Sequence, residues 1–264
     1  MSASLAARLA VALGCVAWAG CKVGSTETAD ASDGGGDAAV DARLDSAPAV
    51  TCHIADVAWL PDVGQYLVLT TTGRALVLDG AGGLVSNRAI GDHAGLVAAC
   101  GGSAVGCQID AVTWRSPTER FVVVNGAIYS LDAALATAGQ PLALTSIPGA
   151  VAGPCAGVTG VCHLDALVWR DDQQRFVAVG QGSAFVIDAA GALVSSSSLR
   201  SIPTLAAGPC ATQVGPCHID ALTHRAPVLH YIASDHLYNL DATTGEPGGS
   251  APLTDFTGLA GVCN

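Results

Sequence analysis

Histidines placed at a fixed distance from aspartates are the residues of this sequence best suited to chemistry. His53, His163 and His218 each directly follow a cysteine, and in the last two cases an aspartate stands two residues further on, as in His163-Leu164-Asp165. Residues two apart on a β-strand share a face, so the imidazole and the carboxylate can point the same way. Such imidazoles, gathered at one end of a channel, would suit a transition metal or haem. The alternative is that each histidine is a local hydrogen-bond partner beside a disulfide.

These histidines belong to an internal repeat, and the repeat organises the rest of the chain. Four segments begin at cysteines that lie 55 residues apart. They read Cys52-His53-Ile54-Ala55-Asp56-Val57, Cys107-Gln108-Ile109-Asp110-Ala111-Val112, Cys162-His163-Leu164-Asp165-Ala166-Leu167 and Cys217-His218-Ile219-Asp220-Ala221-Leu222. Further on, Trp59, Trp114 and Trp169 share one position of the repeat, and His224 takes it in the fourth copy. We expect the tryptophans to form core between repeats.

Each repeat predicts a meander of about four short strands. In the second copy, the β-rich runs Ile109 to Trp114, Phe121 to Val124 and Ala127 to Leu131 are separated by turn residues. Asn125-Gly126 between two of them is a strong hairpin signal. A weak strand or a short helix fits the region from Leu142 to Ile147. One meander has no second layer to cover its faces, and packing four of them around an axis supplies it. The fold class is therefore an all-β, four-bladed propeller with blades at about 52–106, 107–161, 162–216 and 217–264.

The ten cysteines indicate an oxidising compartment, where thiols pair. Three pairs are seven residues apart, and they predict the disulfides Cys100–Cys107, Cys155–Cys162 and Cys210–Cys217. Cys52 and Cys263 then occupy the two halves of the same junction in repeat register, so a bond between them would close the ring. The competing interpretation, metal-binding cysteine pairs, lacks the CxxC spacing of zinc sites.

The N-terminal segment predicts export. Arg8 precedes an apolar run from Leu9 to Ala19, which is long enough for a signal peptide and too short for a membrane span. Trp18-Ala19-Gly20-Cys21 resembles a bacterial lipobox, so we expect a signal peptide over residues 1–20 and a lipidated Cys21. The competing expectations are plain secretion and lipidation of Cys15. Residues 22–50 have the composition of a flexible acidic tether. The expected location is the bacterial cell envelope, with the outer membrane holding the lipid anchor.

Charge and motifs exclude several function classes. The chain carries a formal net charge of −11, which disfavours nucleic acid as a partner. It contains no nucleophile elbow, phosphate-cradling glycine motif or HExxH motif.

The repeat resembles the hemopexin family. The resemblance is carried by the Asp-Ala strand start and, in the second copy, by Arg120-Phe121-Val122-Val123-Val124-Asn125-Gly126, by Tyr129-Ser130-Leu131-Asp132 and by the segment from Gln140-Pro141-Leu142 to Ser146-Ile147-Pro148-Gly149. It implies four blades and a first-to-last-blade disulfide. It also implies a channel cation, Ca²⁺ or Na⁺, held by the main-chain carbonyls of Ala55, Asp110, Asp165 and Asp220.

These observations together favour a monomeric, non-enzymatic binding or adhesion module for a protein, glycan or small-molecule ligand. The first alternative is a periplasmic metal or haem binder that uses His53, His163 and His218. The second is a quinoprotein-like or hydrolytic propeller enzyme, suggested by the string Tyr238-Asn239-Leu240-Asp241-Ala242-Thr243-Thr244-Gly245 in the fourth copy.

Overall fold

A computed structural model describes residues 54–105, 107–233, 236–241 and 247–260. The chain divides into two units, Met1–Val50 and Thr51–Asn264, and all described residues belong to the second. The predicted signal peptide, Cys21, the tether, His53 and the Cys52–Cys263 bond lie outside the described residues. Within those residues, no helix is long and apolar enough to cross a membrane.

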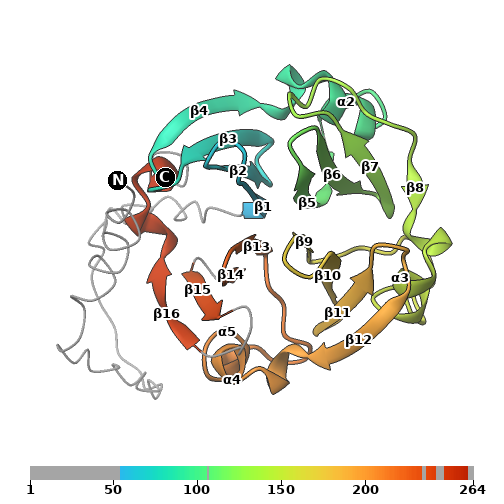
Figure 1. Cartoon of the computed structure of the whole chain (residues 1–264), viewed down its shortest axis with the longest axis vertical. Coiled ribbons are helices and arrows are strands. Elements are labelled where there is room, and N and C mark those ends of the chain that lie inside the picture. The colour runs from blue at the N-terminus through green and yellow to red at the C-terminus, as the bar shows by residue number, and fades with distance from the viewer. Residues whose placement is uncertain (1–53, 106, 234–235, 242–246, 261–264) are drawn as a thin grey trace, which may run out of the picture. The chain divides into compact units, whose positions relative to one another are not determined.

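The structure is a four-bladed propeller, as the repeat predicts (Figure 1). Each blade is one antiparallel sheet whose four strands follow one another in sequence order. The strands of the first two blades are β1 (Ile54–Leu60), β2 (Gln65–Thr70), β3 (Arg74–Asp79), β4 (Leu84–Ala89), β5 (Ile109–Ser116), β6 (Glu119–Val124), β7 (Ala127–Leu131) and β8 (Leu142–Ala143). Those of the last two are β9 (Ala166–Arg170), β10 (Arg175–Gly180), β11 (Ser183–Asp188), β12 (Leu193–Ser198), β13 (Ala221–Arg225), β14 (Val228–Ala233), β15 (His236–Asp241) and β16 (Pro247–Pro252).

A short helical segment follows the outermost strand of every blade. The segments are η1 (Ile90–Asp92) with α2 (Ala94–Ala99), η2 (Leu144–Ser146) with α3 (Pro148–Ala152), η3 (Leu199–Ser201) with α4 (Pro203–Ala207) and α5 (Pro209–Thr212), and η4 (Leu253–Asp255) with α6 (Thr257–Ala260). Pro148 and Pro203 begin their helices at the position where proline is preferred. The segment from Leu142 to Ile147, predicted to be a weak strand or a short helix, therefore contains both.

The core lies between blades, and burial falls from the axis outward. The innermost strands β1, β5, β9 and β13 contact one another in a closed cycle. Every residue of β9 is buried, whereas β12, at the outer edge of the same blade, ends in four exposed serines. Strands covered on both faces have continuous apolar runs, and strands at an exposed edge are polar. The same gradient explains why one blade alone could not fold.

Ring closure uses the same contact as two of the three internal junctions. The helix after each of three blades places a glycine N–H on a carbonyl of the next blade's outer turn: Gly95 on Leu135, Gly149 on Gly191, and Gly258 on Gly82, at 2.9, 2.7 and 2.9 Å. A Cβ on Gly258 would lie 2.6 Å from the Gly82 oxygen, so only glycine allows this approach. The last blade is thus joined to the first by described residues, independently of the predicted Cys52–Cys263 bond.

The three local disulfides are confirmed. Cys100–Cys107, Cys155–Cys162 and Cys210–Cys217 have Cα–Cα distances of 5.5, 5.4 and 5.1 Å. Each one spans the connection from the helical segment of one blade to the innermost strand of the next, and so ties successive blades together.

Candidate functional site

His163 and His218 lie just before the innermost strands of their blades, and each pairs with the preceding blade. His163 Nδ1 lies 3.1 Å from both carboxylate oxygens of Asp110, and His218 Nδ1 lies 3.4 Å from Asp165 Oδ2. The expectation that His163 shares a local site with Asp165 is therefore wrong, since the partner comes from the preceding blade. The third histidine of the set, His53, lies outside the described residues.

The sequence of the second repeat is consistent with pairing between blades. Gln108 replaces the histidine there, and the blade before it has Ala55 where the others have an aspartate. The imidazole is therefore missing at the one junction where no carboxylate would face it. This joint replacement favours the structural interpretation of the histidines, as hydrogen-bond partners that link blades.

The carboxylates at this end of the ring are close enough to affect one another. Burial raises the pKa of Asp110, and the facing His163 opposes that shift. Burial likewise raises the pKa of Asp165, His218 lowers it, and the charges of Asp220 and Asp110 add to the increase. Among the residues that the structure describes, no three metal-ligating side chains form a group that could hold a metal ion.

The residues predicted to offer carbonyls to a channel cation occupy equivalent places. Ala55 and Asp110 lie at register shifts in the pairing of β1 with β2 and of β5 with β6. Asp165 and Asp220 directly precede β9 and β13, and their amides donate to Val179 and Ile232 carbonyls at 2.8 and 2.7 Å. All four therefore interrupt the regular ladder at the start of an innermost strand. Cation binding by their carbonyls remains a prediction.

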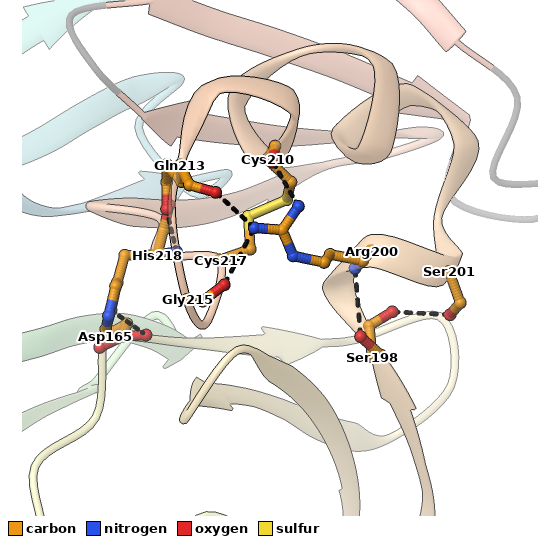
Figure 2. Close-up of a disulfide and its surroundings, with 9 residues drawn as sticks. All are labelled: Asp165, Ser198, Arg200, Ser201, Cys210, Gln213, Gly215, Cys217 and His218. Carbon is orange, nitrogen blue, oxygen red and sulfur yellow. Dashed lines mark hydrogen bonds and ion pairs between the residues drawn. A yellow bond between two sulfur atoms is a disulfide. The ribbon is translucent and has the colours of Figure 1, made fainter.

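The disulfide loop between the last two blades positions one of these histidines (Figure 2). The Arg200 guanidinium donates to the carbonyls of Cys210, Gln213 and Gly215 and holds the loop in shape. The Gln213 side chain accepts from the His218 amide at 2.6 Å and donates to its carbonyl at 2.9 Å. The loop thus fixes the backbone of His218 beside Asp165.

The opposite ends of the innermost strands form a cavity, which we call the tryptophan cup. Its volume is about 380 Å³. One residue from each repeat, at the same position, contributes to its wall: Trp59, Trp114, Trp169 and His224. The other lining residues are Thr113, Val168 and Thr223 one position earlier, and Pro61, Asp171, Asp172, Arg225 and Ala226 further along the chain. All four blades therefore contribute to the cup.

The tryptophans are also core between blades, as expected. The Arg225 guanidinium lies over Trp59, 4.4 Å from the ring centroid, and the Tyr66 ring is 4.6 Å away. Arg115 and Phe176 contact Trp169 in the same manner, at 5.3 and 4.6 Å. In both cases the arginine comes from the preceding blade, so the walls of the cup are rigidly held.

The polar groups around the cup include both hydrogen-bond donors and hydrogen-bond acceptors. Thr223 Oγ1 accepts from the Trp59 amide and Thr113 Oγ1 from the Trp169 amide, both at 2.8 Å and both across a blade junction. Burial, with the nearby Arg170, lowers the pKa of His224, and Asp172 and Asp171 oppose that shift. The buried Trp169 Nε1 has no hydrogen-bond partner among the described residues. The cup thus combines apolar aromatic walls, an imidazole and a charged rim.

Comparison with known proteins supports the fold and leaves the ligand open. No protein-family model and no curated protein matches the sequence. Among solved structures, a hemopexin-fold protein from cow pea is similar, with a TM-score of 0.65 and 14% identity over 80% of this chain and 98% of that one. A plant lectin with two metal binding sites and a plant albumin showing hemagglutination, both from Cicer arietinum, have TM-scores of 0.62 and 0.63. Each is 15% identical, over 79% of this chain and 97% of the other.

Proposed function

We propose, from the premise that this chain has the hemopexin fold, that it is a non-enzymatic binding module displayed at the cell envelope, with the tryptophan cup as its recognition site. The observation that carries the proposal is the cup itself. Its volume falls within the range of small-molecule sites, and its walls stand on the innermost strands, the most firmly held elements of the ring.

The chemistry of the cup favours a small ligand rich in hydroxyl groups, such as the terminal sugar of a glycan. Asp171 and Arg225 line the rim on neighbouring blades, next to indole walls. The Arg225 Nη1 already donates to Tyr66 and Gly80, and Asp171 Oδ1 accepts from Gln174, so a ligand would use the remaining oxygen of Asp171 and the remaining N–H groups of Arg225. Sites that combine apolar aromatic surface with a few placed polar groups are typical of such recognition. Two proteins of similar structure, a plant lectin and a plant albumin showing hemagglutination, are consistent with a glycan ligand.

Display at the envelope rests on the sequence. A lipidated Cys21 would anchor the chain, and the acidic segment of residues 22–50 would hold the ring away from the bilayer. A channel cation held by the carbonyls of Ala55, Asp110, Asp165 and Asp220 would be structural in this scheme, away from the cup.

A thermal-shift screen of the protein against mono- and oligosaccharides, haem and divalent cations tests the proposal, because a ligand that binds only the folded state raises its melting temperature. A saturable shift with a saccharide, lost in Asp171→Ala, is the expected result. Asp92→Ala, an exposed acid outside the cup, is the matched control and should respond as the unaltered protein does. A screen without a saccharide hit, or a hit that Asp171→Ala leaves intact, would refute the proposed site.

A further inference from the structure

A single buried carboxylate lies between all four innermost strands. Asp56 is fully buried. Its Oδ1 accepts from the amides of Val57 and Leu222 at 2.8 and 3.2 Å, and its Oδ2 accepts from the amide of Val112 at 2.7 Å. The amide of Leu167 is a fourth donor. Burial raises the pKa of Asp56 well above its usual value, and the four hydrogen bonds oppose that increase. One side chain of the first blade therefore bonds to every blade.

The four donors are equivalent by the repeat. Val57, Val112, Leu167 and Leu222 each stand five residues after the first cysteine of their copy. Their N–H groups converge on one place because the innermost strands surround it. A concave set of backbone N–H groups binds an anion, since it offers several donors and no acceptor. The convergence is thus a property of the ring, and Asp56 is the group that fills it.

In the other three repeats, the position equivalent to Asp56 is an alanine, so the ring axis holds a single carboxylate. Ala111, Ala166 and Ala221 occupy the place of Asp56 in the remaining copies, and each is fully buried. A second acid there would bring two buried negative charges together. The first copy reads Ala55-Asp56 where the others read Asp-Ala. This exchange places one carboxylate opposite the four amides.

We propose that the ring axis is a binding site for one small monovalent anion of carboxylate type, formed by the amides of Val57, Val112, Leu167 and Leu222, and that Asp56 is its built-in ligand. This goes beyond the proposed function and does not depend on it.

Removal of the carboxylate should open the site to formate, which replaces the deleted group atom for atom. We expect Asp56→Ala to melt well below the unaltered protein in sodium gluconate, and to regain at least half of the loss in sodium formate at equal ionic strength, with saturation. Asp56→Asn, which replaces one acceptor with a donor, should melt low in both salts. The unaltered protein should not distinguish the salts.

A relocated carboxylate provides a test without added anion. β5 has the same register shift before Ala111 that β1 has before Asp56, so the second blade is the nearest equivalent. Asp56→Ala combined with Ala111→Asp should recover most of the lost stability in gluconate. If Asp56→Ala does not fold alone, folding of the double variant supports the proposal, and its failure to fold refutes it. Equal melting of Asp56→Ala and the unaltered protein, or an equal formate effect on both, would also refute it.

Discussion

Replacing His163 with alanine should destabilise the ring by about 1–2 kcal/mol at pH 7. The Asp110 side chain is only 2% exposed, and the imidazole lies 3.1 Å from both of its oxygens. A buried polar group deprived of its partner costs about 1–3 kcal/mol. The His163 side chain is itself 47% exposed, so water can replace part of the lost interaction and the lower half of that range applies. For a domain of this size the melting temperature should fall by about 2–8 °C.

The loss should depend on pH with a defined sign. Burial raises the pKa of Asp110, and His163 opposes the increase, so the variant should have a still higher pKa. A carboxyl whose folded pKa exceeds its unfolded value keeps its proton longer in the folded state, and its contribution to stability falls as the pH rises through the folded pKa. The deficit of His163→Ala should therefore shrink toward pH 4, where Asp110 takes up its proton.

The second repeat provides the control. Gln108 stands at the same position opposite Ala55, with no carboxylate to leave unpaired, so Gln108→Ala should change stability by less than about 0.5 kcal/mol. Urea and thermal unfolding of both variants between pH 4 and pH 7.5 would measure the difference. Equal losses in the two variants, or a His163→Ala deficit that stays constant down to pH 4, would show that the inter-blade pair does not stabilise the ring.

Three further predictions concern the closure, the channel and the anchor. Cys263→Ser should lower the melting temperature more than Cys155→Ser in scanning calorimetry, because closing a loop of 212 residues stabilises by roughly 5 kcal/mol and an eight-residue loop by roughly 2.5; an equal or smaller drop contradicts closure by Cys263. Chelation of calcium should lower the melting temperature if the channel carbonyls hold Ca²⁺, and no change would count against that ion. Cys21→Ser should abolish fatty-acid labelling and detergent-phase partitioning of the protein in bacterial cells, whereas unchanged partitioning would place the lipid elsewhere.

The fold was predictable because its determinants repeat along the chain. Cysteines, tryptophans and hairpin turns recur every 55 residues, so the blades and local disulfides follow from register. The pairs between blades could not be predicted in the same way. Proximity in the sequence favours His163 with Asp165, whereas the ring pairs His163 with Asp110. A usable signal existed in the joint replacement at Ala55 and Gln108.

The role of Asp56 was beyond sequence reasoning for a different reason. Its partners are backbone amides, and every residue except proline has one, so no pattern of side chains marks them. In the sequence it appears only as a departure from Asp-Ala. The tryptophan cup could be predicted in part. The repeat places its wall residues at one position of each blade, but the cavity between them depends on the distance between blades.

The consecutive strand order of the four sheets has a consequence for chain connectivity. No sheet draws strands from both ends of the described chain, and the last blade meets the first through the same glycine contact that joins the first blade to the second and the second to the third. The ring therefore has no preferred starting blade, and circular permutation should be tolerated. A chain joined from residue 264 to residue 51 and reopened between Cys100 and Cys107 would keep every blade intact. The predicted Cys52–Cys263 bond would then be local, and Cys100–Cys107 would become the long-range bond.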